Sequence, residues 1–240
     1  MASRKEEKER LRREREERER AASDAQRRKR LIGYGTGGVL ALAALVVLIV
    51  AVVLPALGGD DNGGEESSLL PAGGRVGQLQ ETDVAKAAET AGCELKDEKG
   101  KSRDHTGDPS EIIKYDSNPP MSGRHFETPA QESAYTEAPP DPSLVHALEH
   151  GRINVWYKPT APKRVRADLK ALYDRDQGFQ ELLIPRPDMP YMVAATAWTA
   201  DPQPLGTGHL LGCRTANAQA LQALQAFIEE YRGNGPEPVP

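Results

Sequence analysis

Apolar and polar residues divide the chain into blocks of very different character. Residues 1–30 are dominated by charged side chains, residues 31–57 carry no charge at all, and the remainder mixes apolar and polar positions. The uncharged block is longer than the roughly 20 residues that a helix needs to cross a bilayer. The pattern therefore predicts one transmembrane helix over 31–57, preceded by a charged N-terminal helix or tail.

Charges on either side of the uncharged block predict its orientation. Basic residues at 27–30 precede it and acidic residues follow it at 60–66, which is typical of a cytoplasmic N-terminus. Beyond it we expect a flexible linker at 58–80, an extracytoplasmic domain at 81–232 and a proline-rich tail at 233–240. The expected location is the cell membrane, with the lipid bilayer as a partner. The interleaved charges and the net charge of −5 argue against nucleic acid as a partner.

Shorter periodicities predict both helices and strands in the outer domain. Apolar residues three and four positions apart indicate helices, whereas alternating apolar and polar residues indicate strands. The predicted helices are 82–91, 141–150, 164–176 and 216–232, and the predicted strands are 111–115, 152–158, 181–184 and 191–198. This order predicts an α+β fold, in which a small, mostly antiparallel sheet is packed by helices on one face.

The two cysteines of the chain, Cys93 and Cys213, both lie in the predicted outer domain. Outside the cytoplasm a disulfide is the favoured state of such a pair. It closes a loop of about 120 residues, which the chain-entropy account values at about 4–5 kcal/mol. A pair of free thiols and a pair of metal ligands are the alternatives at this point.

Three of the five histidines lie in two short segments that contain glycine. His125 belongs to SGRHFETP at 122–129, and His146 and His150 belong to HALEHG at 146–151. Side chains four positions apart on a helix are neighbours, so the last two imidazoles can chelate one ion. We predict a metal site formed by His125, His146 and His150.

The identity of the metal depends on the remaining ligands. Imidazole with the thioether of Met121 suits copper, whereas imidazole with the carboxylate of Glu149 suits zinc. His209 is a further candidate ligand. The competing interpretation is a non-catalytic structural or protein-interaction domain of the cell envelope, in which the histidines hydrogen-bond backbone and hold the irregular segment 118–140. Such a domain has an envelope protein as its partner.

A zinc hydrolase is a third interpretation of the same residues. His146, Glu149 and His150 match the inverted zincin pattern, with Glu149 as the base and Glu229 or Glu230 as a distant third ligand. The pattern is short enough to arise by chance. The sequence also contains no glycine-rich phosphate loop, no nucleophile elbow and no Cys-x-x-Cys pair. It therefore favours a domain that is not an enzyme.

The two histidine segments resemble the paired motifs SGxHxxxP and HxLEHG of an uncharacterised actinobacterial family, a domain of unknown function. The resemblance continues through residues 155–157 and 197–198 and covers the chain from Cys93 to its end. It implies a charged N-terminus, one membrane helix and an outer domain. It implies no activity, so the function must be argued from the residues themselves.

Overall fold

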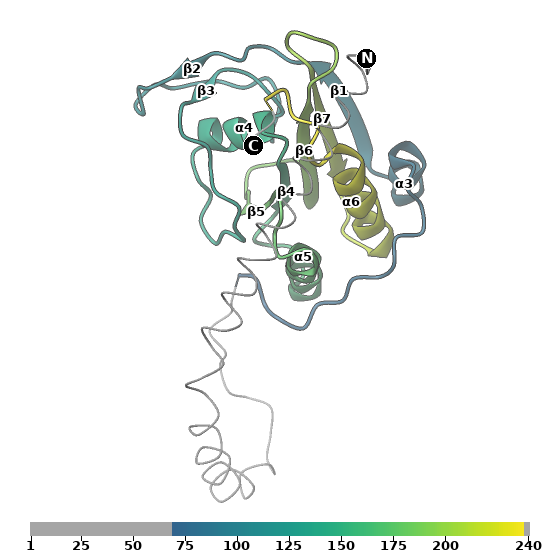
Figure 1. The fold of residues 1–240 in the computed structure, drawn as a ribbon. Coiled ribbons are helices and arrows are strands. Elements are labelled where there is room, and N and C mark those ends of the chain that lie inside the picture. The colour runs from purple at the N-terminus through teal and green to yellow at the C-terminus, as the bar shows by residue number, and fades with distance from the viewer. Residues whose placement is uncertain (1–68, 238–240) are drawn as a thin grey trace, which may run out of the picture. The chain divides into compact units, whose positions relative to one another are not determined.

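A sheet of five strands lies at the centre of residues 69–237, the part of the chain that the computed structural model describes. The strand order is β1–β7–β6–β4–β5, with β6 in the middle (Figure 1). Two shorter strands pair separately beside it. The strands are β1 (Glu94–Lys99), β2 (His105–Thr106), β3 (His125–Phe126), β4 (Ile153–Tyr157), β5 (Glu181–Pro185), β6 (Val193–Thr199) and β7 (Thr207–Cys213).

Helices cover both faces of this sheet, which corrects the expectation of helices on one face (Figure 1). The helices are α3 (Val84–Ala91), α4 (Asp141–Glu149), α5 (Lys163–Arg175) and α6 (Ala218–Tyr231). All residues of β4 are buried, and its side chains alternate between the faces. Val155 packs in the apolar cluster with α3, α5 and α6, whereas Trp156 packs in the cluster with α4. The sheet is therefore the middle layer of three.

The strands of the sheet run in mixed directions. Three neighbouring pairs, β1–β7, β7–β6 and β6–β4, are antiparallel, whereas β4 and β5 are parallel. The parallel pair arises because α5 connects β4 to β5 as a crossover, which lets the second strand start at the same end as the first. The sheet of this α+β fold is therefore mixed, with three of its four strand pairs antiparallel.

The predicted fold class also includes one transmembrane helix, at residues 31–57. Within residues 69–237 no helix has both the length and the apolar composition required to span a membrane. The longest of these helices, α6, has 14 residues, against roughly 20 for a bilayer. The segments predicted as a charged helix or tail, at 1–30, and as a membrane span, at 31–57, lie outside the described residues.

Most predicted helices and strands of the outer domain are confirmed to within about two residues. The exceptions are β1, β2, β3 and β7, which the pattern does not predict, and the strand at 111–115, which does not form. β1 has the sequence ELKDEK because it is an edge strand with largely solvent-facing side chains, so it shows no apolar alternation. Ile112, at the centre of the wrongly predicted strand, is 87% exposed and has no apolar face to cover.

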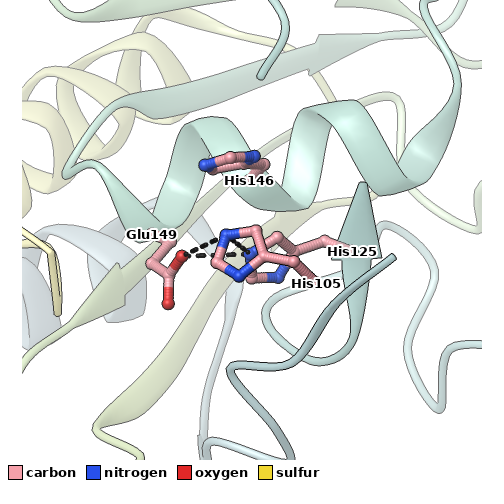
Figure 2. Close-up of side chains that lie close together, drawn as sticks. All are labelled: His105, His125, His146 and Glu149. Carbon is pink, nitrogen blue, oxygen red and sulfur yellow. Dashed lines mark hydrogen bonds and ion pairs between the residues drawn. The ribbon is translucent and has the colours of Figure 1, made fainter. Parts of the chain in front are cut away.

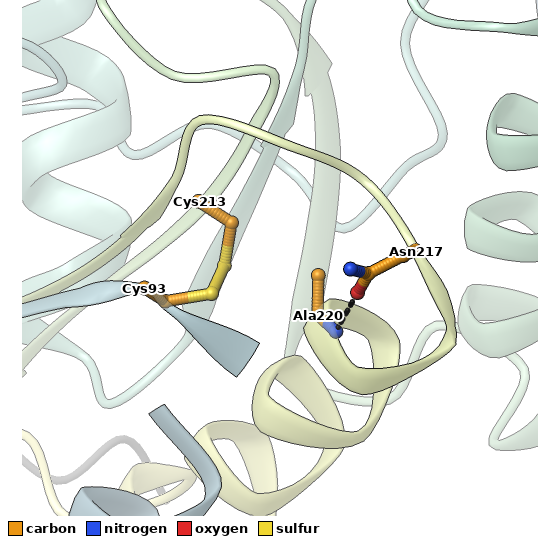
Figure 3. Close-up of a disulfide and its surroundings, with 4 residues drawn as sticks. All are labelled: Cys93, Cys213, Asn217 and Ala220. Carbon is orange, nitrogen blue, oxygen red and sulfur yellow. Dashed lines mark hydrogen bonds between the residues drawn. A yellow bond between two sulfur atoms is a disulfide. The ribbon is translucent and has the colours of Figure 1, made fainter. Parts of the chain in front are cut away.

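The cysteines form the predicted disulfide, Cys93–Cys213, so neither is a free thiol or a metal ligand (Figure 3). It joins the residue before β1 to the last residue of β7, and these two strands are hydrogen-bonded neighbours. Asn217 lies nearby and caps α6, because its side-chain oxygen accepts a hydrogen bond from Ala220 N at 2.8 Å. The covalent bond therefore holds an edge strand of low apolar content against the core.

The first described residues, which belong to the segment predicted as a linker, contact the domain. Arg75 N donates to Asp168 Oδ1 of α5 at 2.6 Å, and Gln80 N donates to Gln222 Oε1 of α6 at 2.9 Å. Four partly buried apolar residues of the same stretch pack against the core: Leu69, Leu70, Val76 and Leu79.

Candidate metal centre

Three imidazoles and one carboxylate converge beside α4 (Figure 2). They belong to His105 on β2, His125 on β3, and His146 and Glu149 on α4. One nitrogen or oxygen atom from each residue lies within 4.8 Å of the corresponding atoms of the other three. We refer to these four residues as the His–Glu cluster.

Strand pairing and helix periodicity each contribute one half of the cluster. β2 and β3 are parallel and His105 is paired directly with His125, which places the two rings on the same side of the ribbon. Their Nε2 atoms are 3.0 Å apart. His146 and Glu149 are three positions apart on α4, so they share one face of that helix. Local structure therefore presents two pairs of donors, and the packing of the β2–β3 ribbon on α4 joins them.

Main-chain carbonyls orient the two buried imidazoles. Nδ1 of His125 lies 2.7 Å from Gly123 O, and Nδ1 of His146 lies 2.6 Å from Phe126 O. A carbonyl oxygen can only accept, so both Nδ1 atoms carry a hydrogen and donate it. In a neutral ring the free lone pair is then on Nε2. Metal-binding histidines are commonly held in this way by a carbonyl at the other ring nitrogen.

The carboxylate of Glu149 is completely buried, and both of its oxygens have partners. Oε1 accepts a hydrogen bond from Arg103 Nε at 2.7 Å, and Oε2 lies 3.0 Å from His125 Nε2. Burial by itself raises the pKa of a carboxyl group, but the hydrogen bonds of His125 and Arg103 outweigh it and lower the pKa of Glu149 to about 2. Glu149 is therefore anionic at neutral pH.

His146 is neutral under the same conditions. Burial lowers its pKa to about 4, and the neighbouring imidazoles act in the same direction, whereas the hydrogen bond to the Phe126 carbonyl opposes them. A neutral imidazole and an anionic carboxylate are the protonation states that bind a metal ion. At neutral pH His146 is therefore already neutral and Glu149 already anionic.

The centre of the cluster requires a positive charge. Nε2 of His125 lies 3.0 Å from both Glu149 Oε2 and His105 Nε2. Because Nδ1 of His125 donates to Gly123, a neutral His125 directs its lone pair at the carboxylate. Two acceptors at that distance repel unless a proton or a metal cation lies between them. The contacts around His125 therefore fit either a proton on Nε2, donated to Glu149, or a metal cation at this position.

The structure brings together only part of the predicted site. His125 and His146 belong to the cluster, whereas His150 does not. The ring of His150 lies against that of His146, with centroids 4.6 Å apart, and its Nδ1 lies 3.2 Å from Glu237 O. His150 is thus a neighbour of the cluster that is held by a different contact.

The two additional candidate ligands also lie elsewhere. Met121 is buried in the apolar cluster that α4 covers. His209 lies on β7, where its Nδ1 is 2.7 Å from Asp97 Oδ1 and its Nε2 is 2.8 Å from Thr199 Oγ1. Asp97 is paired directly with His209 across β1 and β7, so these contacts are cross-strand polar contacts of the sheet.

The inverted zincin arrangement does not form among the described residues. It requires His146 and His150 to share an ion while Glu149 acts as a base, but Glu149 belongs to the His–Glu cluster and His150 does not. Glu229, proposed as a distant third ligand, makes ion pairs with Arg175 and Arg232 instead. Glu230, the alternative to it, is an exposed residue of α6.

His105 and Arg103 are the functional residues that sequence reasoning does not identify. They lie in a short polar stretch, SRDHTG, that has no apolar periodicity. The sequence does show that they are two positions apart, and residues with this spacing lie on the same face of an extended strand. Only the pairing of β2 with β3 places this face against Glu149.

The fold and the cluster define an α+β domain with a candidate transition-metal centre. Residues 107–240 match the family described as "Protein of unknown function (DUF3105)", and the chain belongs to this family. The resemblance to an uncharacterised family is thereby confirmed, while its actinobacterial origin and its two motifs stay predictions. The match includes His125, His146 and Glu149 and begins just after His105. Neither the curated proteins nor the solved structures contain a match.

Proposed function

We propose that this domain binds a divalent transition-metal ion, zinc, through His105, His125, His146 and Glu149. The observation that carries the proposal is the contact of 3.0 Å between the Glu149 carboxylate and Nε2 of His125. The hydrogen on Nδ1 of His125 leaves the Nε2 of a neutral ring as an acceptor, so this buried contact needs either a proton on Nε2 or a bound cation. The convergence of two further imidazoles on the same point supports the cation.

The separations within the cluster suit a tetrahedral ion. Zinc binds imidazole and carboxylate at about 2.1 Å, so neighbouring ligand atoms around it lie about 3.4 Å apart. His125 Nε2 lies 3.0 Å from the two nearest donors, and His105 Nε2 lies 3.4 Å from Glu149 Oε2. No two of the four donor atoms are more than 4.8 Å apart, so a small movement of one side chain brings all four to bonding distance.

The donor set favours zinc over copper. Three imidazoles with one carboxylate are nitrogen and oxygen donors, which zinc accepts readily. The argument for copper rests on the thioether of Met121, which instead lies in the apolar cluster beneath α4. Metal content measured by mass spectrometry on protein isolated without added metal tests this choice; stoichiometric copper in place of zinc would contradict it.

Zinc titration of the full chain tests metal binding directly. We expect one zinc ion per chain, with affinity reduced by roughly 100-fold or more in His125→Ala and His146→Ala, because each loses a buried ligand. His209→Ala is the matched control, since it removes an imidazole on β7 that is outside the cluster. Absence of zinc binding in the unaltered chain would instead establish the histidines as a structural, hydrogen-bonded group.

We also propose that the domain acts in an oxidising compartment outside the cytoplasm. The disulfide Cys93–Cys213 supports this, because such bonds persist where thiols are not kept reduced. The test is thiol alkylation of the protein in intact cells followed by mass spectrometry. Alkylation of both cysteines without prior reduction would exclude this location.

A further inference from the structure

The C-terminal segment of the described chain, residues 233–237, crosses the end of α4 beside the His–Glu cluster. Glu237 N donates to Glu149 O at 3.0 Å, and Gly233 N donates to Gly151 O at 2.8 Å. The last carbonyls of a helix have no partner within the helix, so this segment supplies a partner for the Glu149 carbonyl. We refer to residues 233–237 as the C-terminal strap.

The strap also reaches the cluster through a charged side chain. Oε2 of Glu237 lies 3.7 Å from a terminal nitrogen of Arg103, whose Nε donates to Glu149 Oε1 at 2.7 Å. Glu149 is thus held twice. Its main chain is bonded to the strap, and its carboxylate is bonded to an arginine that pairs with the strap.

Close packing fixes the position of the strap on the helix end. A Cβ atom added at Gly235 would collide with the backbone of Gly151 and with the carbonyl oxygen of Glu149. Gly151 itself has a φ of +78°, a left-handed conformation that favours glycine and turns the chain out of α4. The strap therefore packs directly on the backbone at the end of α4, with no room for a side chain at Gly235.

We propose that docking of the C-terminal strap and metal binding by the His–Glu cluster are thermodynamically coupled. The docked strap holds Glu149 ready for the metal, and Arg103 and Glu237 act as positioning residues. This inference rests on the proposed function of the cluster. A coupling between two binding equilibria is reciprocal, so the metal stabilises the docked strap by the same factor. Loss of the metal should therefore weaken the docking of the strap on the end of α4.

Substitutions at Glu237 separate the two contacts of the strap. Glu237→Gln removes the charge that faces Arg103 and keeps the N–H group, whereas Glu237→Pro also removes the N–H group that bonds Glu149 O. We expect zinc affinity to fall about 10-fold to 100-fold in the proline variant, as for other residues that support metal ligands, and less in the glutamine variant. The side chain of Glu237 is half exposed, so both variants remain folded.

Glu230→Gln is the control for these variants. It makes the same change of charge at an exposed position of α6 and should leave zinc affinity unchanged. Hydrogen exchange supplies a readout that a merely structural strap does not move. Zinc should slow exchange of the Gly233 and Glu237 amides in the unaltered chain, and it should have no such effect in His125→Ala.

The outcomes distinguish the two proposals. If the unaltered chain binds no zinc, the proposed function and the coupling both fail. If it binds zinc, but Glu237→Pro binds equally well and strap exchange does not respond to zinc, the coupling alone is overturned. In that case the strap stabilises the fold without acting on the metal site.

Discussion

The side chains of the His–Glu cluster differ in how far they are exposed to solvent. His125 and Glu149 are completely buried. Nδ1 of His125 donates a hydrogen bond to Gly123 O, and Oε1 of Glu149 accepts one from Arg103. His105 is the exception, because about a third of its side chain is exposed. At the residue scale, the cluster therefore consists of three buried side chains and one imidazole, that of His105, which is partly exposed to solvent.

This difference predicts unequal effects of removing ligands. His105→Ala should weaken zinc binding by about 10-fold, because water can take the vacant position, whereas His125→Ala should weaken it by roughly 100-fold or more. Zinc titration of both variants against a competing chelator measures the two losses. Equal losses would show that exposure of His105 does not make it replaceable.

Glu181 gives a prediction for stability outside the cluster. Burial raises the pKa of Glu181 to about 7. The nearby positive charge of Arg232 lowers this pKa, and the nearby carboxylates raise it. A carboxyl group whose pKa is higher in the folded state than the ordinary 4.5 binds protons more strongly when folded. The free energy of unfolding should therefore fall by about 3 kcal/mol as pH rises from about 4.5 to about 7.

Urea unfolding at pH 5 and at pH 8 measures this dependence. Glu181→Gln cannot ionise, so its stability should change less between these two pH values than that of the unaltered chain. Glu230→Gln, which removes an exposed carboxyl group, should behave like the unaltered chain. Identical pH profiles for the chain and Glu181→Gln would contradict the assignment.

At the scale of elements, the end of α4 decides which imidazoles meet. The helix pattern predicts His146 and His150 as a chelating pair, but the helix ends at Glu149 and the chain turns at Gly151. Periodicity locates a helix well and its last residue poorly, since end positions depend on what packs there. Here the C-terminal strap packs against the helix end, and Nδ1 of His150 contacts the Glu237 carbonyl of the strap.

The edge strand β1 is the element that depends most on the disulfide. Its charged sequence contributes few buried apolar contacts, so reduction of Cys93–Cys213 should destabilise the domain by about 4–5 kcal/mol, the value for a loop of this length. Urea unfolding with and without reductant measures the change. The double variant Cys93→Ala/Cys213→Ala should not respond to reductant, and an equal response in both would refute the explanation.

At the scale of the whole molecule, metal binding should add to the stability of the fold. The four ligands come from β2, β3 and α4, so unfolding separates them and releases the ion. At a free zinc concentration of 100 times Kd, the free energy of unfolding should rise by about 2.7 kcal/mol. Thermal or urea unfolding with and without zinc tests this. His209→Ala should keep the increment, and His125→Ala should lose it.

The sequence by itself determined the positions of most helices and strands, the disulfide pair, and the choice of His125 and His146 as candidate site residues. These follow from local periodicity and from the limited number of cysteines, which do not require knowledge of how distant segments pack. Only the tertiary structure decided that His105 belongs to the cluster, that His150 lies outside it, and that Arg103 donates a hydrogen bond to Glu149. The reason is physical: these contacts depend on the register of β2 with β3 and on the packing of the strap at the end of α4.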